Sequence, residues 1–281
     1  MEKIVVFGLG LIGGSMALSL KQKNRCFIGV DPNKAHAQKA LELGIIDEIG
    51  SLKEAVDAQI IIIAVPVNVA PELTLKILDL IDEQALVFDV GSVKTSICEA
   101  VKHHPKRFNF VAAHPIAGTE FSGPTAAFNG LFRGKKNIIC EPNQTAQVIL
   151  QSALSIFKEL EMSTSFMEAK AHDKHIAYVS HLSHISSFML GKTVLEIEKD
   201  EASIFTMAGS GFASTVRLSK SSPETWTPIF IQNKNNILKS LDEYIKNLNQ
   251  FRELLYQHNT EAIYQAMKDT HKLKKILEDI K

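Results

Sequence analysis

The sequence predicts an α/β protein, with a doubly wound parallel sheet in residues 1–165 and an all-helical domain in residues 166–281. Two observations predict the sheet: an apolar segment breaks into a glycine-rich turn near residue 8, and short β-rich segments then alternate with helical patterns. A third predicts the helical domain, because only long helical patterns follow residue 169. We therefore expect a domain boundary near residues 160–170.

The apolar segment at residues 4–7 leads into the turn Gly8-Leu9-Gly10-Leu11-Ile12-Gly13. Gly8 permits a tight turn, Gly10 lets backbone N–H groups approach a pyrophosphate, and Gly13 lets the next helix pack closely on the sheet. The N-terminus of that helix, expected at residues 15–23, would face the anion. The pattern is typical of a Rossmann-type dinucleotide site, with expected contacts from Gly8, Gly10, Leu11, Ile12 and Gly13.

A second predicted strand, residues 26–30, ends in Asp31, at the position that binds a ribose 2′-hydroxyl in such sheets. Its carboxylate would repel a 2′-phosphate, so Asp31 favours NAD over NADP, although Lys34 lies close by. The alternative is a structural glycine turn with an incidental aspartate. The strand, turn, helix and second strand around it favour the dinucleotide site.

Further apolar segments extend the predicted sheet and carry ligand-facing ends. Segments without polar alternation are expected where a strand is covered on both faces. Ligands bind at the carboxyl ends of strands in open α/β sheets, which places Val65 and Ser92 at the cofactor. The strands are expected at residues 60–65, 86–90, 110–113 and 137–140, followed by a helix at residues 146–160.

The composition excludes several partners. Lysine plus arginine equals aspartate plus glutamate at 31 each, so no net field attracts nucleic acid or an anionic membrane surface. The 45% hydrophobic content is ample for a sizeable core. No segment approaches the roughly 18 uninterrupted apolar residues of a membrane helix. We expect no nucleic-acid partner, no membrane span and no signal peptide.

The cysteines Cys26, Cys98 and Cys140 are widely spaced and contain no CxxC pair. This pattern favours reduced thiols in a cytoplasmic protein over a disulfide framework. None of the three resembles a nucleophile or part of a metal cluster.

Two polar residues follow predicted strands and are candidates for catalysis. Ser92 could reach a substrate oxygen or the nicotinamide ribose, or it could instead N-cap the next helix. His114 follows the strand at residues 110–113, and an imidazole with a pKa near 6.5 can accept a proton from an alcohol as hydride leaves. A lone histidine can equally be structural.

Four histidines, His172, His175, His181 and His184, lie close together in a helical segment. At about 100° per residue, the first two fall on one side of a continuous helix and the last two nearly opposite. One straight helix cannot gather all four around an ion, so a metal site would need ligands from elsewhere. We expect no metal, and we expect His181 and His184 to face the core or a cleft.

Arg217 stands among small and apolar residues, an unusual setting for a solvated charge. A buried arginine needs an anionic partner, and its planar fork suits a substrate carboxylate. The alternative is a structural salt bridge to a residue such as Glu120.

Apolar residues recur at helical spacing in segments 237–255 and 261–280. We expect packing faces of a helical domain or a dimer interface, formed by Leu241, Ile245, Leu248, Leu255, Ile263, Met267, Leu273, Leu277 and Ile280.

Taken together, these motifs resemble those of the prephenate dehydrogenases of tyrosine biosynthesis, with the related arogenate and cyclohexadienyl dehydrogenases. The resemblance implies an NAD-dependent oxidative decarboxylation: hydride passes from C4 of prephenate to NAD, carbon dioxide leaves C1, and 4-hydroxyphenylpyruvate forms. The resemblance spans nearly the whole chain and rests on residues 8–15, 89–94, 114–120, 172–173, 180–184 and 217, which stand in the family's order.

The resemblance also implies residue roles and an assembly. His114 polarises or deprotonates the C4 hydroxyl, Ser92 hydrogen-bonds near that hydroxyl and the nicotinamide, and Arg217 holds a substrate carboxylate. Relatives commonly dimerise through the helical domain, so a homodimer is expected. The residues implied to line the substrate cleft are His184, His181, Thr119 and Glu120.

Three alternatives stay open at this point. Arogenate carries an amino group where prephenate carries a keto group, so an arogenate or dual-specificity enzyme fits the same motifs. A hydroxyacid dehydrogenase would usually use a helix-borne lysine, against which the His114 motif argues. A non-catalytic NAD-binding regulator would not need His114, His184 and Arg217 together.

Overall fold

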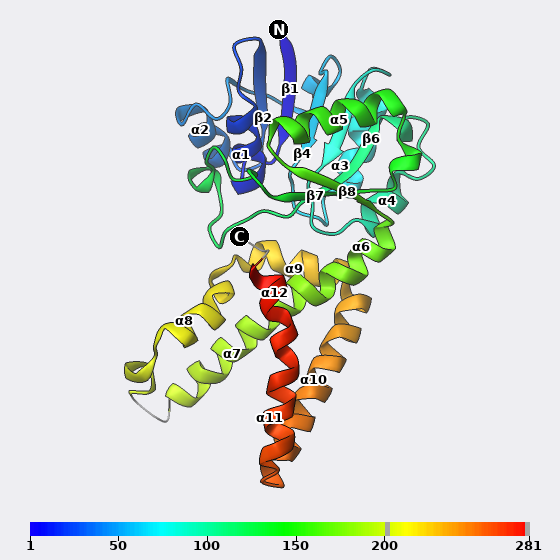
Figure 1. The fold of residues 1–281 in the computed structure, drawn as a ribbon. Coiled ribbons are helices and arrows are strands. Elements are labelled where there is room, and N and C mark those ends of the chain that lie inside the picture. The colour runs from blue at the N-terminus through cyan, green and yellow to red at the C-terminus, as the bar shows by residue number, and fades with distance from the viewer. Residues whose placement is uncertain (200–202, 279–281) are drawn as a thin grey trace. The chain divides into compact units, whose positions relative to one another are not determined.

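The computed structural model describes residues 1–199 and 203–278 (Figure 1). The chain forms two compact units, Met1–Lys234 and Asn235–Lys281. All the candidate site residues fall within the first unit. The expected functional division at residues 165/166 stays a prediction, because compactness divides the chain at a different place.

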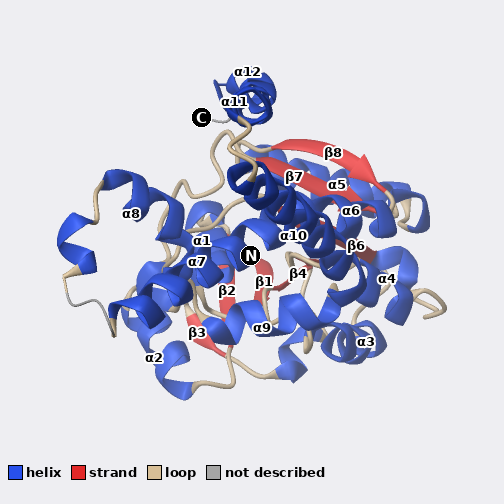
Figure 2. Cartoon of the chain, turned by 90° about the horizontal axis from the view of Figure 1, so that it is seen from below, coloured by secondary structure: helices blue, strands red, loops and turns tan. Residues whose placement is uncertain are grey.

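The first unit is built on one sheet of eight strands in the order β3-β2-β1-β4-β5-β6-β7-β8 (Figure 2). All neighbouring strands are parallel except β6 and β7, which are antiparallel. The predicted doubly wound sheet is therefore confirmed. Its strands are β1 Glu2–Phe7, β2 Arg25–Val30, β3 Glu48–Ile49, β4 Ile60–Ile63, β5 Leu86–Asp89, β6 Phe110–Pro115, β7 Lys136–Cys140 and β8 Ser163–Met167.

Helices cover both faces of this sheet. One face packs against α1 (Leu11–Leu20), α2 (Lys34–Glu42) and α5 (Gln147–Glu159), and the other against α3 (Ala70–Leu80) and α4 (Thr95–Val101). The four isoleucines of β4 are all buried, which explains why that strand shows no polar alternation. A parallel sheet with two covered faces fixes its strand ends firmly, and the candidate site lies at those ends.

The first unit continues as helices after β8. These are α6 (Ala169–Ile176), a π-helical turn (Ala177–His181), α7 (Leu182–Glu198), α8 (Ser210–Val216) and α9 (Pro223–Gln232). Helix α9 packs on the sheet edge, because its Ile229 and Trp226 form an apolar cluster with Val67 after β4 and Val93 after β5. The helical segment thus reaches the residues that follow the strands.

The second unit contains α11 (Thr260–Asp269), α12 (Leu273–Glu278) and most of α10 (Lys234–Tyr256). The predicted helical patterns in this region are confirmed, except that a short 3₁₀ turn, Thr270–Lys272, separates α11 from α12. Ile280 lies outside the described residues. Several of the predicted apolar residues are exposed in the single chain: Ile245, Leu248, Leu255, Met267, Leu273 and Leu277.

Two features of the sheet were not predicted from the sequence. Strand β3 is only two residues long, and the edge strand β8 is half exposed and largely polar, so neither gives a strong apolar signal. Helix α1 also begins at Leu11, earlier than the expected residue 15. The earlier start brings the helix N-terminus directly to the glycine-rich turn.

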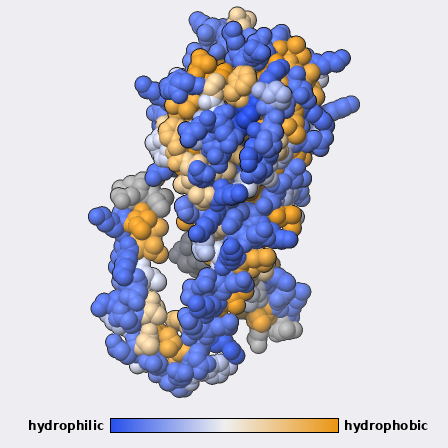
Figure 3. Space-filling view, turned by 90° about the vertical axis from the view of Figure 1, so that its right-hand side faces the viewer, coloured by the Kyte–Doolittle hydropathy of each residue, from blue (hydrophilic) through white to orange (hydrophobic). Residues whose placement is uncertain are grey.

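No described helix is long and apolar enough to cross a bilayer. The face shown in Figure 3 is mostly hydrophilic, with hydrophobic residues in separate groups.

The ends of β5 and β6 are joined by a buried cation. The Lys94 ammonium forms an ion pair with Asp89 and donates to the carbonyl oxygen of Ala113 at 2.7 Å, and both charged side chains are fully buried. Burial raises the pKa of Asp89, while Lys94 opposes that shift. The pair therefore holds the residue before His114 against the strand that precedes Ser92.

Removal of this cation tests the fold. We expect Lys94→Met to lower the free energy of unfolding by about 3–5 kcal/mol, because the Asp89 carboxylate loses its buried partner. The matched control is Lys102→Met, whose ammonium is half exposed and 3.8 Å from Glu99; it should cost no more than about 1 kcal/mol. Denaturant titrations measure both, and equal small losses would contradict a structural role for the buried pair.

Candidate active site

The glycine-rich turn follows β1, and two of its glycines are required by the fold. Gly8 has φ +91°, and a Cβ there would lie 2.4 Å from the Ala64 carbonyl oxygen. A Cβ on Gly13 would lie 2.0 Å from the Gly8 carbonyl oxygen, so α1 could not approach the turn. At Gly10 a Cβ would meet no atom of residues 1–199 or 203–278 within 4 Å. The space over Gly10, at the N-terminus of α1, suits an anionic ligand.

Asp31, directly after β2, is fastened beside this turn. One carboxylate oxygen accepts from the Leu9 N–H at 2.9 Å, and the other accepts from the Asn33 N–H at 2.9 Å. Asn33 in turn caps α2 with its side chain. Asp31 is therefore an ordered part of the turn, and each oxygen keeps lone-pair capacity for a ribose hydroxyl.

Val65 and Ser92 follow β4 and β5, as expected from the sequence. The alternative role for Ser92 is wrong, because the N-cap of α4 is Lys94 and no side chain caps that helix. The Ser92 hydroxyl oxygen is buried and has no hydrogen-bond partner among the described residues. A buried hydroxyl without a partner is uncommon, so Ser92 fits a site completed by a ligand.

His114 lies in β6 and makes a side-chain contact that the sequence did not reveal. Its Nδ1 is 2.8 Å from Nε2 of His172 in α6, and Nδ1 of His172 is 2.8 Å from a carboxylate oxygen of Asp173. Burial lowers the pKa of His114 well below 6.5, with further lowering from His172, Lys94 and His181. His114 is therefore a neutral base at pH 7.

Asp173 links this chain of histidines to the turn after β5. Its carboxylate accepts from the backbone N–H groups of Lys94 and Thr95 at 2.8 Å each. Burial opposes ionisation, but hydrogen bonds from His172 and from these N–H groups hold the pKa of Asp173 below its ordinary value. The ionised carboxylate joins α6 to the segment that carries Ser92.

The segment that carries the four histidines is helical, but it is not one regular α-helix. The π-helical turn Ala177–His181 advances fewer degrees per residue than an α-helix, so it rotates the residues beyond it. His181 and His172 are both buried, and both lower the pKa of His114. Within residues 1–199 and 203–278, no group of three or more acidic, cysteine or histidine side chains could hold a metal ion.

His181 is held by Asn233, at the end of α9. The Asn233 amide nitrogen donates to the Asp173 carbonyl oxygen at 2.7 Å and lies 3.1 Å from Nδ1 of His181. Burial lowers the pKa of His181 to about 4, although Asp173 opposes the shift. His181 is therefore neutral, as the buried partner of a neutral amide.

His184, one turn further along, is stacked on the only tryptophan of the chain. The ring centroids of His184 and Trp226 are 3.4 Å apart, and Nδ1 of His184 donates to the Ser180 carbonyl oxygen at 3.0 Å. Burial lowers the pKa of His184, and Arg217 lowers it further. The second ring nitrogen is left as an acceptor.

Arg217 is more exposed than its apolar setting in the sequence suggested, since its side chain is 53% exposed. It pairs with Glu120 at 3.4 Å, so the alternative salt bridge is present in the structure. The long distance and exposed guanidinium leave Arg217 able to exchange partners. Its position at the end of α8 keeps it close enough to His184 to lower the pKa of that ring.

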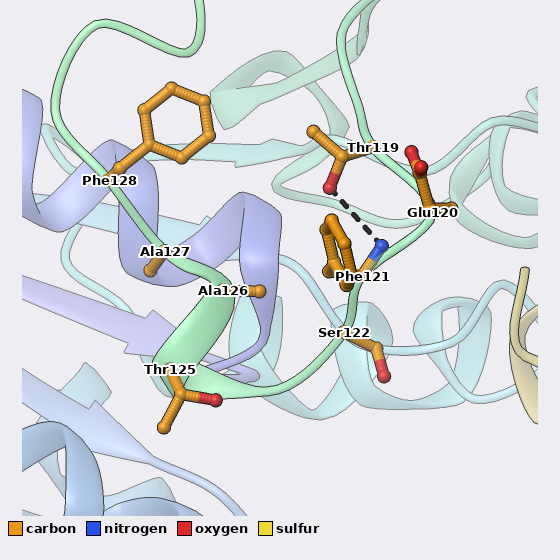
Figure 4. Close-up of a pocket in the computed structure, with 8 residues that line it drawn as sticks. All are labelled: Thr119, Glu120, Phe121, Ser122, Thr125, Ala126, Ala127 and Phe128. Atoms are coloured by element: carbon orange, nitrogen blue, oxygen red, sulfur yellow. Dashed lines mark hydrogen bonds between the residues drawn. The ribbon is translucent and has the colours of Figure 1, made fainter.

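Thr119 and Glu120 belong to the loop between β6 and β7, which lines a pocket of about 730 Å³ (Figure 4). The Thr119 hydroxyl accepts from the Phe121 N–H at 3.2 Å. The loop is fixed on α1, because the Phe128 N–H donates to the Ser15 hydroxyl at 3.0 Å. The remaining lining residues are Phe121, Ser122, Thr125, Ala126, Ala127 and Phe128.

Two family models match the chain. Residues 16–165 match the family model described as the nucleotide-binding domain of prephenate dehydrogenase, and residues 168–269 match the dimerization domain. The chain belongs to the prephenate dehydrogenase family.

Relatives and solved structures cover nearly the whole chain. Prephenate dehydrogenase of Bacillus subtilis is 32% identical over 95% of this chain and 74% of its own length. A crystal structure of prephenate dehydrogenase from Aquifex aeolicus, in complex with hydroxyphenyl propionate and NAD+, has a TM-score of 0.88 and 31% identity, covering 98% of both chains. Synechocystis arogenate dehydrogenase has a TM-score of 0.77 and 28% identity, covering 98% of this chain and 99% of its own.

Within this prephenate dehydrogenase fold, the sequence assigned no role to three residues of the polar network: His172, Asp173 and Asn233. Their motifs or positions were visible, but the spacing of 58 residues between His114 and His172 gives no sign of contact. One signal was present in the sequence, namely the adjacent pair His172-Asp173.

The glycine turn gives a test that separates fold from ligand binding. Gly13→Ala should lower thermal stability, because its Cβ would overlap a backbone oxygen. Gly10→Ala should cost the free chain no more than about 1 kcal/mol, yet weaken NAD binding at least tenfold by filling ligand space. Thermal unfolding and NAD titration followed by Trp226 fluorescence measure the two effects. Unchanged NAD affinity in Gly10→Ala would refute this placement of the pyrophosphate.

Proposed function

We propose that this chain catalyses the NAD-dependent oxidative decarboxylation of prephenate to 4-hydroxyphenylpyruvate, a step of tyrosine biosynthesis. The observation that carries the proposal is a buried neutral base, His114, at the same sheet edge as the glycine-rich turn, in a chain of this family. A base and a dinucleotide turn at one edge are what oxidation of an alcohol requires.

The cofactor assigned to this site is NAD. Gly8, Gly10 and Gly13, with the first helical residues Leu11 and Ile12, form the pyrophosphate turn. Asp31 faces the ribose and disfavours a 2′-phosphate. Val65 and the Ser92 hydroxyl, which has no partner in the described part of the chain, complete the strand-end contacts. When bound, NAD supplies the hydride acceptor.

His114 handles the proton of the C4 hydroxyl. Loss of hydride from C4 and of carbon dioxide from C1 converts the ring to a phenol, so the reaction as a whole releases no proton. The base therefore takes the hydroxyl proton as the C4 oxygen gains double-bond character, and it returns that proton to the phenolate oxygen. Because burial lowers its pKa, the base form of His114 is present at neutral pH and is lost only in more acidic solution.

Arg217 is assigned to a substrate carboxylate. Its guanidinium is accessible and, among the described residues, pairs with Glu120 at the long distance of 3.4 Å, so a carboxylate can replace or share that contact. His184 and His181, neutral because burial lowers their pKa values, line the same region without adding positive charge. Thr119 and Glu120 supply its polar wall.

Arogenate is the second candidate substrate. It is favoured by the fold shared with the Synechocystis arogenate dehydrogenase and by a cyclohexadienyl dehydrogenase of Zymomonas mobilis that is 26% identical over 96% of the chain. The two substrates differ only in a keto or amino group of the side chain, far from the His114 chemistry.

A cytoplasmic homodimer is part of the same proposal. The matched dimerization domain supports self-association, and the apolar residues Leu195 and Ile197 of α7 are exposed in the single chain, like several in α10. A second copy of the chain would remove these side chains from water.

Substrate preference is tested by following NADH production with prephenate, arogenate and a simple 3-hydroxy acid. We expect turnover with prephenate and none with the 3-hydroxy acid, which cannot gain aromaticity. No turnover of either cyclohexadienyl substrate would overturn the proposal. Faster turnover of arogenate than of prephenate would assign the second candidate instead.

Two substitutions separate proton transfer from substrate binding. His114→Asn should lower kcat by about 10² to 10⁴ with little change in KM, because it removes a group needed in the transition state. Arg217→Gln should chiefly raise KM for prephenate, by tenfold or more. Steady-state kinetics measure both, and equal modest changes in kcat and KM in the two variants would contradict the assigned roles.

A further inference from the structure

The donor and acceptor in each hydrogen bond of the Asp173 carboxylate can be assigned from the chemistry of its partners. The backbone N–H groups of Lys94 and Thr95 can only donate, so both carboxylate oxygens of Asp173 act as acceptors. The oxygen that accepts from Lys94 also lies 2.8 Å from Nδ1 of His172. An ionised carboxylate can only accept, so Nδ1 of His172 carries a proton.

The same assignment of donor and acceptor extends to His114. With its proton on Nδ1, His172 presents a lone pair at Nε2, which lies 2.8 Å from Nδ1 of His114. His114 must therefore carry its own proton on Nδ1. Its Nε2 keeps a lone pair, which is the atom required for a base.

We propose that His172 and Asp173 are positioning residues that fix the tautomer of His114 and so make its Nε2 the base for the C4 hydroxyl. This inference rests on the proposed function for the identity of the reaction, but the tautomer itself is a property of the protein. His172 and Asp173 act through His114 and are assigned no contact with substrate.

The surroundings of His114 explain why its tautomer matters for the reaction. The charged and titratable groups that face His114 are His172 from α6, Lys94 from the turn after β5 and His181 from the π-helical turn. The Lys94 ammonium disfavours an imidazolium, and so does burial of the ring. With ionisation disfavoured, the site works with a neutral imidazole, for which only one of two tautomers is productive.

Asp173 also fixes the second buried histidine. Asn233 donates one amide hydrogen to the Asp173 carbonyl oxygen, which identifies the atom as nitrogen, so its other hydrogen points to Nδ1 of His181. His181 therefore carries its proton on Nε2, the opposite tautomer to His114. Nε2 of His114 is therefore an acceptor and Nε2 of His181 a donor, and both tautomers depend on contacts with Asp173.

The test compares the complete enzyme with Asp173→Asn, His172→Gln and His172→Leu. In Asp173→Asn the amide places a donor where the carboxylate had only acceptors, which favours the wrong tautomer of His172 and hence of His114. We expect kcat to fall about 10² to 10⁴, with KM for prephenate and NAD affinity within about threefold of wild type. His172→Gln keeps an acceptor oxygen for His114 and should retain at least tenfold more activity than His172→Leu.

Two readouts distinguish this role from a merely structural one. Nitrogen NMR of ring-labelled histidine, with His114→Asn used to assign the signal, should show His114 protonated on Nδ1 in wild type and on Nε2 in Asp173→Asn. The deuterium isotope effect at C4 should rise in Asp173→Asn, because the slowed chemical step, which includes hydride transfer from C4, then limits turnover. The control is His175→Gln, the same change on the exposed side of α6, which should match wild type.

Wild-type His114 protonated on Nε2 would overturn the proposal, as would a kcat for Asp173→Asn within threefold of wild type. If Asp173→Asn fails to fold, equal activities of His172→Gln and His172→Leu would overturn it. Failure of the proposed function has a different signature, which is wild-type protein that turns over neither cyclohexadienyl substrate while His114 still shows the Nδ1 proton.

Discussion

The Asp173 carboxylate is the contact on which the rest of the site depends. It is buried and ionised, and it collects hydrogen bonds from one histidine and from two backbone N–H groups of the turn after β5. Charge-assisted bonds of this kind are about twice as strong as neutral ones. A single side chain therefore joins α6, which carries His172, to the turn that carries Ser92.

Lys94 is the second buried charge at the site, and it links Asp173 to the sheet. Lys94 donates its backbone N–H to Asp173, while its ammonium reaches Asp89 and the carbonyl oxygen of Ala113. The strands on either side of the site are thus tied to the same residue. Neither charge could be placed by composition, because burial of a lysine depends on partners that are distant in the sequence.

The sequence predicted those elements of the fold that depend on neighbouring residues or on a repeating pattern of apolar residues. Strand β4 was recognisable because four buried isoleucines have no other plausible environment, and the turn at Gly8 and Gly13 was recognisable because only glycine fits there. Strand β8 was missed because an edge strand is half exposed and needs no apolar signal. The π-helical turn was missed because its hydrogen bonds leave no periodic pattern. His181 is buried as expected, but together with His172, which a regular helix would set on the opposite side.

The sequence identified individual site residues better than their connections. His114 could be placed at a strand end, but its productive state depends on His172 and Asp173, which lie more than fifty residues away. The structure also separates residues that the fold requires from those it does not. Gly13 is fully explained by the packing of α1, whereas a Cβ on Gly10 would meet no described atom within 4 Å and the Ser92 hydroxyl has no partner among the described residues. Because contacts within the chain do not explain Gly10 and Ser92, these two residues indicate where a ligand binds. Both lie at the edge of the sheet that also holds the base, His114.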